Sequence, residues 1–204
     1  MIDANRSTFS EPGEEQLYET RLIIAGRHVA PDPIVAFDRR GPVSDAIVTR
    51  AAAGRATEAR AAATAAAHAF GDWAATKPQD RVTILSRAAD AMIRQADEVV
   101  HIASAEVGSA PEWVRFNVEL AAGMLRQTAD LVDQRGECPT PLEGYALHRR
   151  PSGVVLGIAP WNAAVALATR AVAAPLACGN TVVLKVSELC PKTHEWVAQT
   201  ICDA

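Results

Sequence analysis

Two apolar runs, separated by a long apolar segment, dominate the C-terminal part of the chain. The runs cover 153–159 and 181–186, and each is continuously apolar rather than alternating. Strands that are buried on both faces of a parallel sheet have this pattern. The segment between them, 163–178, carries Arg170 as its one charge, so we expect a helix that is covered on all sides. The pattern predicts a β-α-β unit and hence an α/β fold.

Alanine-rich and amphipathic patterns predict helices over most of the preceding chain. Alanine dominates 43–70, and because it is the best helix former we expect one long helix beginning near Ser44 or Asp45. Low-complexity disorder does not fit, because the charge of this stretch is too low and its apolar content too high. The pattern breaks at 71–78, and a second, amphipathic helix is expected with Asp80 as its N-cap.

The pattern predicts two further helices before the apolar unit. One covers about 97–107 and ends at Gly108, a residue suited to a helix C-cap. The next begins near Pro111 and ends at Gly136. Large apolar residues recur along it at helical spacing, and we interpret them as its buried face rather than a ligand site: Trp113, Phe116, Leu120, Met124, Leu125 and Leu131.

These elements divide the chain into four parts. Residues 1–42 form an N-terminal arm, with a hairpin predicted around Gly26 in RLIIAGRHV. Residues 43–136 form a helical layer, 137–150 a hairpin or extended arm, and 151–204 the first part of a dinucleotide-binding βαβ unit, which is incomplete. The predicted fold class is therefore α/β, a partial Rossmann-like cofactor domain with an N-terminal helical layer.

The composition argues against several classes of partner. The chain has 204 residues, 49% of them hydrophobic, with a formal net charge of -4 and a pI near 5.7. No basic cluster is present to bind nucleic acid. Residues 1–15 lack the basic and apolar segments of a secretory signal, and the longest uncharged run, 151–169, is interrupted by Pro160 and Asn162. We therefore predict a cytoplasmic protein that binds neither nucleic acid nor a membrane.

The cysteines have neither metal-binding nor disulfide spacing. Four are present, none of them in a CxxC pair: Cys138, Cys178, Cys190 and Cys202. Cys178 and Cys190 lie near helix ends, but no histidine is placed by sequence to act as a partner, so we interpret all four as structural thiols. His101 and Glu106 are five positions apart rather than three or four, so we interpret them as solvated or capping residues and predict no metal site.

Polar residues gather where the two predicted strands end. Pro160 ends the first strand because it has no backbone N–H for the sheet, and Asn162 stands where a helix N-cap belongs. Ligands of open α/β sheets bind beyond the carboxyl ends of the strands. The candidates at these ends are Trp161, Asn162, Lys185, Ser187 and Glu188. The alternative left open at this point is that Asn162 merely caps the helix, Trp161 packs and Lys185 is a solvated charge.

The literal motifs at these strand ends resemble those of the aldehyde dehydrogenase superfamily. PWN follows the first apolar strand, and GNTVVLKVSE follows one helix later. The resemblance implies that the Asn162 side-chain amide donates to the oxyanion, and that Lys185 and Glu188 hold the adenosine ribose of the nicotinamide cofactor. Two departures from the family pattern remove no polar group. Ala163 and Ala164 replace an aromatic residue and a proline, and KVSE replaces KPSE.

The resemblance covers about residues 35–204 and implies further details of the site. The cofactor-binding residues are expected to be Ile158, Ala159, Pro160, Trp161, Lys185, Ser187 and Glu188. A carboxylate near the ribose repels a 2′-phosphate, so we predict NAD rather than NADP. The segments RRPSGVVLGIAPWNA and SELCPKTH are most similar to those of dehydrogenases of aromatic aldehydes such as salicylaldehyde or vanillin.

The resemblance also implies what a working enzyme needs beyond these residues. A cysteine thiolate forms a thiohemiacetal with the aldehyde, hydride passes to the nicotinamide, and a glutamate acts as base for thioester hydrolysis. In the family both groups lie downstream of the segment equivalent to 185–188. We therefore expect this chain to be an N-terminal portion that lacks the catalytic Cys and Glu and is inactive alone. The completed enzyme is expected to bind an aldehyde and to form a homo-oligomer, or to associate with the missing C-terminal portion.

Two alternatives to catalysis stay open at this stage. One is a non-catalytic interaction module that associates with intact aldehyde dehydrogenase subunits through an exposed sheet edge. The other is a unit that binds the cofactor without chemistry.

Overall fold

The computed structural model of the protein describes residues 17–29, 35–133 and 148–204. Its strands are β1 (Tyr18–Thr20), β2 (Leu22–Ile24), β3 (Arg27–Val29), β4 (Ala36–Arg40), β5 (Ile47–Ala52), β6 (Val154–Ile158) and β7 (Thr181–Lys185). Its helices are α1 (Ala56–Ala75), α2 (Pro78–Arg94), α3 (Ala96–Val107), α4 (Pro111–Asp133), α5 (Ala164–Ala177) and α6 (Pro191–Cys202). The start of the predicted N-terminal arm, the helix end at Gly136 and most of the predicted 137–150 arm lie outside the described residues.

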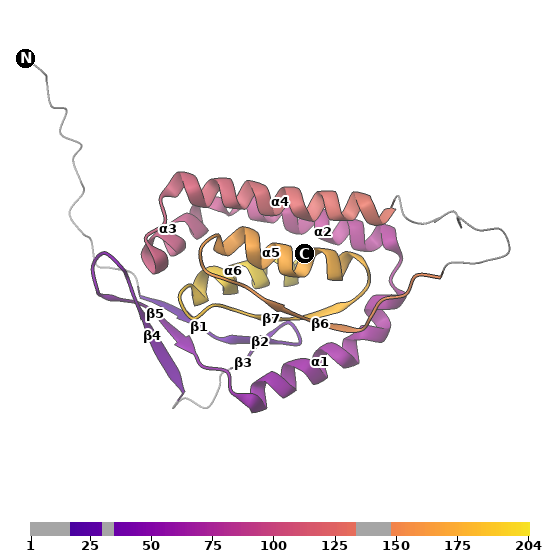
Figure 1. The fold of residues 1–204 in the computed structure, drawn as a ribbon, viewed down its shortest axis with the longest axis horizontal. Helices are drawn as coiled ribbons and strands as arrows, with labels where there is room; N and C mark the ends of the chain where they lie inside the picture. Colours follow the sequence, from indigo (N-terminus) through magenta and orange to yellow (C-terminus); the bar gives the residue numbers. More distant parts are fainter. Residues whose placement is uncertain (1–16, 30–34, 134–147) are drawn as a thin grey trace, which may run out of the picture.

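The parallel pair β6–β7 and the helix between them form the predicted β-α-β unit (Figure 1). Val154 pairs with Thr181 at one end of the ladder and Ile158 with Lys185 at the other. Helix α5 covers one face of the pair at close range, since a Cβ added at Gly157 would lie 3.1 Å from the Ala171 side chain. The α/β prediction is confirmed.

The other face of β6 is bare in the described part of the chain, which corrects the prediction that both faces of this strand are buried. Val154, Leu156 and Ile158 alternate along this face and are 41%, 62% and 67% exposed. Helix α1 lies on this side of the pair, but none of its residues is buried. The continuous apolar pattern is therefore that of a strand with two apolar faces, of which α5 covers one.

The predicted long helix over 43–70 is wrong in its first part. Residues Ile47–Ala52 form β5, which pairs with β4 on one side and β1 on the other, and the helix begins only at Ala56. Two β-branched residues, Val48 and Thr49, are buried in this strand. Because a central strand is stabilised by partners on both sides, long-range pairing overrides the local helix preference. The predicted hairpin around Gly26 is confirmed as β2–β3, whose turn has positive φ at Ala25 and Gly26.

Of the next three helix boundaries, the end of α1 and the start of α2 differ from the predictions by small shifts, and the end of α3 agrees. Helix α1 continues through Gly71 to Ala75, and α2 begins at Pro78 with Lys77 at the N-cap. Asp80 instead lies in the first turn of α2, where a negative charge complements the helix dipole. Gly108 is the C-cap of α3, with φ 67°, as predicted.

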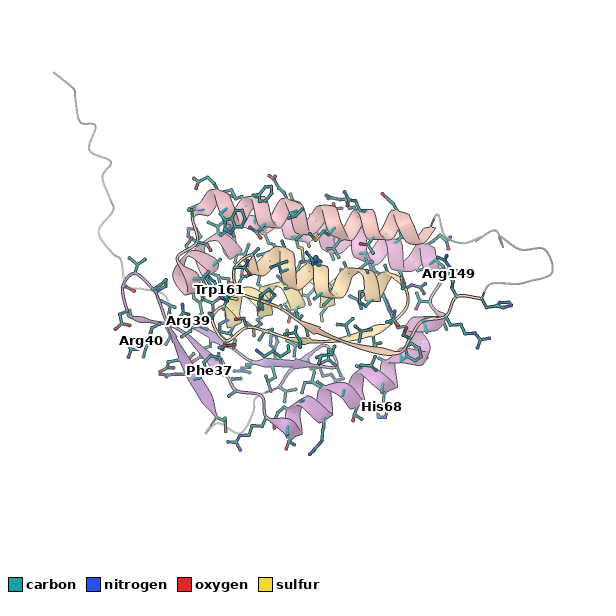
Figure 2. The ribbon with its side chains drawn as sticks, in the orientation of Figure 1. Phe37, Arg39, Arg40, His68, Arg149 and Trp161 are labelled. Atoms are coloured by element: carbon teal, nitrogen blue, oxygen red, sulfur yellow. The ribbon has the colours of Figure 1, made fainter. Side chains whose placement is uncertain are left out.

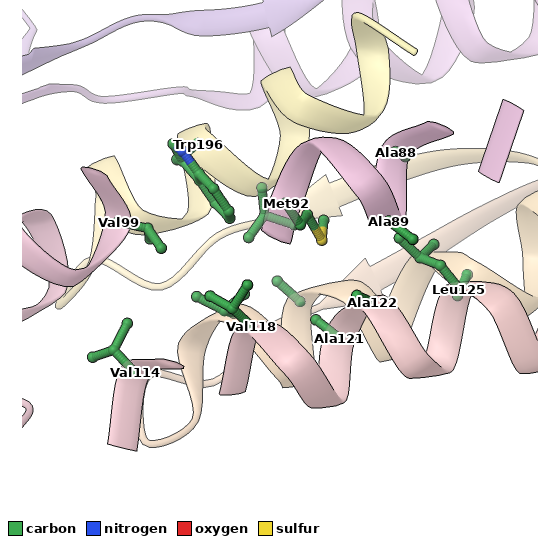
Figure 3. Close-up of a cluster of buried hydrophobic side chains, with 14 of the residues drawn as sticks. Ala88, Ala89, Met92, Val99, Val114, Val118, Ala121, Ala122, Leu125 and Trp196 are labelled. Carbon is green, nitrogen blue, oxygen red and sulfur yellow. The ribbon is translucent and has the colours of Figure 1, made fainter. Parts of the chain in front are cut away.

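Helix α4 packs on α2 and α5 through a different face from the one predicted. The side chains that face the core are small or medium in size: Val114, Val118, Ala121, Ala122 and Leu125 (Figure 3). Ala129, further along the helix, is also buried. Among the residues predicted to be buried, Leu125 is buried, whereas Trp113, Phe116 and Leu120 are exposed. The small side chains let the helices approach closely, and this favours the alanine face over the aromatic one.

A buried carboxylate joins three elements next to this core. Glu106, near the end of α3, is fully buried and accepts hydrogen bonds from Thr49 Oγ1 at 2.9 Å, and from Lys192 N, Thr193 N and Thr193 Oγ1 at 2.8 Å each. It therefore caps the N-terminus of α6 across 86 residues of chain, so of the two interpretations of Glu106 the solvated one is wrong and the capping one holds, for a distant helix. Burial raises the pKa of the Glu106 carboxyl, and the four donors offset part of that rise.

Arg39 of β4 extends this junction toward the loop before α6. Its Nε donates to the backbone carbonyl of Glu106 and to that of Leu189, both at 2.9 Å. Strand β4 therefore ties the end of α3 to the loop 186–190.

Replacing Glu106 tests the importance of this junction for stability. In Glu106→Gln one carboxylate oxygen becomes an amide nitrogen that faces donors, so we expect the free energy of unfolding to fall by about 2 kcal/mol. Urea denaturation of the 204-residue chain measures it. The control is Glu119→Gln at an exposed position of α4, and equal stability of the two variants would contradict the role of Glu106.

Candidate functional site

The candidate site lies where β6 and β7 end and the helices α5 and α6 begin. The two loops concerned are 159–163 and 186–190, and the ladder contact Ala159 N to Lys185 O, 3.0 Å, joins their bases. Figure 2 shows Trp161 and Arg39 at this end of the molecule, with Arg149 at the opposite end. The predicted site residues therefore share one edge of the sheet.

Asn162 does not cap α5, which corrects the N-cap prediction. The helix begins at Ala164 with Ala163 at the N-cap position, and no side-chain cap is present there. Asn162 is exposed, and its backbone carbonyl accepts a hydrogen bond from Trp113 Nε1 at 3.4 Å. No described residue is hydrogen-bonded to its side-chain amide. The loop is thus held through its backbone while the amide keeps its donors free for a ligand.

Lys185 and Glu188 form an exposed ion pair at the end of β7. Lys185 Nζ lies 3.4 Å from Glu188 Oε2, and the side chains are 58% and 69% exposed. A hydrogen bond from its own backbone N–H lowers the pKa of the Glu188 carboxyl, and Lys185 lowers it further. Glu188 is therefore a carboxylate at neutral pH, beside an ammonium group that can also donate.

Ser187, between these two residues, is buried and serves the loop itself. Its Oγ accepts a hydrogen bond from Leu189 N at 3.2 Å, and its backbone N–H donates to His194 Nδ1 at 3.1 Å. The side chain is therefore not presented to a ligand in the way that Lys185 and Glu188 are.

A cysteine and a histidine lie together behind this loop, which corrects the prediction that no histidine partners Cys190. Cys190 Sγ lies 3.8 Å from Nδ1 and 3.6 Å from Nε2 of His194, and both residues are fully buried. Burial raises the pKa of the Cys190 thiol to about 12, so it stays protonated and is a poor nucleophile. The structural interpretation of this thiol therefore stands. The spacing of four residues at a helix start was the signal that sequence reasoning overlooked.

A groove of about 1040 Å³ opens on the bare face of β6–β7. Its lining comes from α1, α6, strand β2 with the turn that follows it, and the pair β6–β7, and Phe37 of β4 also lines it (Figure 2). Of the predicted site residues, Ile158, Lys185 and Glu188 line the groove, whereas Ala159, Pro160, Trp161, Asn162 and Ser187 do not. The groove therefore reaches the ion pair but stops short of the loop that carries Asn162.

An exposed aromatic pair lies on the other side of Asn162. Trp113 and Phe116 of α4 stack with ring centroids 5.7 Å apart, and they are 46% and 52% exposed. The hydrogen bond from Trp113 to the Asn162 carbonyl fixes this pair next to the loop. Sequence reasoning assigned both residues to the core, because spacing alone does not show which face of α4 is covered.

Neither a metal site nor a membrane-spanning helix is present in the described residues. The described residues contain no group of three or more His, Cys, Asp or Glu side chains that could hold a metal ion. In residues 17–29, 35–133 and 148–204, no helix is both long and apolar enough to span a membrane.

Comparison with known proteins identifies the family. The model of the aldehyde dehydrogenase family matches residues 29–204. The chain belongs to the aldehyde dehydrogenase family. Enzymes of this family act on aldehydes, use NAD(P)⁺ and are commonly oligomeric.

Individual relatives agree with this assignment. The chain is 47% identical over 192 residues to a vanillin dehydrogenase of Pseudomonas sp. (strain HR199 / DSM 7063), covering 92% of this chain and 40% of the relative. It matches the crystal structure of a salicylaldehyde dehydrogenase from Pseudomonas putida G7 complexed with salicylaldehyde, with a TM-score of 0.84, 35% identity, and coverage of 91% of this chain and 39% of that one. It also matches 1-pyrroline-5-carboxylate dehydrogenase from Thermus with bound NAD, with a TM-score of 0.85 and 26% identity, over 93% and 38% of the two chains.

The chain thus spans about 40% of the length of the aldehyde dehydrogenases that it matches. The family, the partial aldehyde dehydrogenase fold and the similarity to enzymes of aromatic aldehydes, all predicted from the motifs, are confirmed. The comparisons give no support to the alternative of a non-catalytic interaction module.

Proposed function

We propose that this chain forms part of an NAD-dependent aldehyde dehydrogenase that oxidises an aromatic aldehyde to a carboxylic acid. One observation carries the proposal. The free side-chain amide of Asn162 follows β6, and the Lys185–Glu188 pair follows the adjacent parallel strand β7. The oxidation of an aldehyde by NAD requires this segment to provide an oxyanion donor and a ribose-binding pair at one edge of the sheet. The catalytic cysteine and glutamate are proposed to lie in further polypeptide, and the 204-residue chain alone is proposed to be inactive.

Asn162 is proposed to stabilise the negative charge that develops on the aldehyde oxygen when a thiolate attacks. A donor contributes most when it is oriented before the reaction, because no reorganisation is then needed in the transition state. The contact from Trp113 Nε1 to the Asn162 carbonyl restrains the loop without using the side-chain amide. Both amide hydrogens therefore remain available to the oxyanion.

Lys185 and Glu188 fit the adenosine ribose of NAD. A vicinal diol offers two donors and two acceptors. The pair supplies an ammonium donor and a carboxylate acceptor 3.4 Å apart, and both residues line an apolar groove. NAD supplies the hydride acceptor when it is bound. We propose that the carboxylate of Glu188 binds the 2′-hydroxyl and repels a 2′-phosphate, so that NAD is preferred to NADP.

The aromatic pair on α4 supports an aromatic substrate. Trp113 and Phe116 present exposed rings next to the loop of Asn162, and an aromatic aldehyde can stack on or against such rings. The identity of 47% to a vanillin dehydrogenase supports the same substrate class.

The association of this chain with further polypeptide and its location in the cell are proposed from two different observations. The apolar row of Val154, Leu156 and Ile158 on β6 is exposed in the described chain and supports association with further polypeptide or with a second subunit. Free thiols at Cys178, Cys190 and Cys202 support a reducing compartment, and we infer a cytoplasmic location.

Asn162→Ala tests the oxyanion role in a chimaera in which this chain replaces the matching 40% of the Pseudomonas sp. vanillin dehydrogenase. Removing one oxyanion donor is expected to lower kcat by about 10² to 10³ while the KM for NAD stays near that of the parent. Steady-state rates of NADH formation measure both constants. Gln127→Ala, at an exposed position of α4, is the control, and unchanged turnover in Asn162→Ala would remove this residue from the mechanism.

Glu188→Gln tests the choice of cofactor in the same chimaera. Loss of the charge is expected to reduce the ratio of kcat/KM for NAD to that for NADP by roughly tenfold, because the repulsion of the 2′-phosphate disappears. Asp38→Asn is the matched control, since Asp38 also pairs with a cation, Arg50, at 2.8 Å but lies outside the site. A ratio that does not move in Glu188→Gln would exclude this origin of the preference.

Trp113→Leu tests the substrate class. Loss of the ring is expected to lower kcat/KM for an aromatic aldehyde by about fivefold more than kcat/KM for a short aliphatic aldehyde. The aliphatic aldehyde is the internal control. Because Trp113 also donates to the Asn162 carbonyl, a shift of that loop would lower kcat/KM for both substrates alike. Equal losses for the two substrates would show that the aromatic pair does not contact the substrate.

A further inference from the structure

A small cavity lies between α4 and the start of α5, next to the loop 159–163. Its volume is about 10 Å³, and its lining comes from α3 and the segment after it, from the first turns of α4, and from Ala164 and Val165, the first two residues of α5. A cavity of this size holds one water molecule and no larger ligand, and a water is retained there when several polar groups surround it. The polar groups around this cavity therefore decide whether it is a water site.

Asn117 of α4 lines this cavity and has an acceptor to spare. Its side chain is buried, with the residue only 3% exposed, and its Nδ2 donates to the Trp113 carbonyl at 2.8 Å. Its Oδ1 has no hydrogen-bond partner among the described residues. A buried amide oxygen without a donor costs stability, and ordered water is the usual way in which such an oxygen is satisfied.

The start of α5 brings donors to the same cavity. The first backbone N–H groups of a helix have no acceptor within it, and no side chain caps α5 at its N-cap, Ala163. The first hydrogen bond of this helix runs from Leu167 N to the Ala163 carbonyl, at 2.9 Å. The N–H groups of Ala164 and Val165 precede that bond, so they need an acceptor from outside the helix. A water in the cavity can accept from one of them and donate to Asn117 Oδ1.

Asn117 also supports a direct contact to the loop of Asn162. Its Nδ2 holds the Trp113 carbonyl, and Trp113 Nε1 donates to the Asn162 carbonyl at 3.4 Å. Asn162 lies two residues before Ala164. One buried amide is therefore linked to the Asn162 backbone through Trp113, and to the start of α5 through the cavity.

We propose that Asn117 and one bound water form the N-terminal cap that α5 otherwise lacks, and that Asn117 is thereby a positioning residue for Asn162. The inference rests on the proposed function of Asn162 as the oxyanion donor. An oxyanion donor contributes most when it is oriented before the reaction. Restraint of the backbone on both sides of Ala163 provides that orientation, and the Asn162 side-chain amide stays open to the substrate.

Two variants of nearly equal shape separate positioning from simple packing. Asn117→Val removes both polar atoms of the side chain. Asn117→Thr keeps a hydroxyl that can donate to the carbonyl four residues earlier, as Thr128 Oγ1 does to the Met124 carbonyl at 2.7 Å on the same helix. The lone pairs of that hydroxyl can still accept from the water. A purely structural role of Asn117 predicts changes in stability while the folded enzyme keeps the kcat of the parent in both variants.

Steady-state kinetics of the vanillin dehydrogenase chimaera measures the effect on Asn162. We expect Asn117→Val to lower kcat by about tenfold, because a displaced oxyanion donor loses part of its contribution, while the KM for NAD stays within about twofold of the parent. Asn117→Thr is expected to keep kcat within about threefold of the parent. A kcat that is unchanged in Asn117→Val, or lowered equally in both variants, would overturn the proposal.

Crystal structures of the chimaera and its variants distinguish failure of this inference from failure of the proposed function, because they require no activity. In the parent, a water is expected within about 3.2 Å of Asn117 Oδ1 and of the backbone nitrogen of Ala164 or Val165. A parent structure without this water would refute the inference whether or not the chimaera oxidises aldehydes. If the chimaera is inactive, the proposed function fails and the position of Asn162 decides the inference. Asn162 is expected to shift in Asn117→Val but not in Asn117→Thr, and an unshifted Asn162 in both would refute the positioning role.

Discussion

The carboxylate of Glu106 is the contact on which the position of the site depends. A carboxylate taken out of water is costly unless donors surround it, and here the N-terminus of α6 and two threonine hydroxyls supply them. The start of α6 is thereby fixed relative to α3 and β5. The loop 186–190 leads directly into α6, and its Leu189 carbonyl accepts a hydrogen bond from Arg39. The same junction therefore determines the positions of Lys185, at the end of β7, and of Glu188 in the loop.

The polar residues that stabilise the fold differ from the candidate site residues in their burial and in their hydrogen-bond partners. Glu106 is buried with a full set of partners, and Ser187 and His194 satisfy one another within the fold. Asn162 and the Lys185–Glu188 pair are exposed, and the Asn162 amide is bonded to no described residue. The two sets of residues therefore differ in exposure: Glu106, Ser187 and His194 serve contacts within the fold, whereas Asn162, Lys185 and Glu188 are open to a ligand.

The parts of the fold that the sequence predicted are those whose signals are local. The β-α-β unit follows from two short apolar runs around one apolar helix, the hairpin from the turn at Gly26, and the end of α3 from Gly108. The prediction of Asn162, Lys185 and Glu188 as site residues rests on their positions at or just after the strand ends and on the motifs, of which PWN matches the family pattern and KVSE differs from KPSE at Val186.

The errors arose where distant segments decide the outcome. Strand β5 exists because β1 and β4 pair with it from both sides, which alanine content does not reveal. The exposed face of α4 was misassigned because a stripe of small residues packs closer than an aromatic stripe, and only the neighbouring helices select between them. Glu106 acts across 86 residues, so its role could not be predicted without the fold.

A crystal structure of the vanillin dehydrogenase chimaera with NAD and an aromatic aldehyde tests the central claim most directly. We predict that Lys185 Nζ and a Glu188 carboxylate oxygen lie within hydrogen-bonding distance of the adenosine ribose hydroxyls, while the Asn162 side-chain nitrogen points at the aldehyde oxygen. A ribose bound away from Lys185 and Glu188, or an Asn162 amide turned away from the aldehyde, would contradict the account.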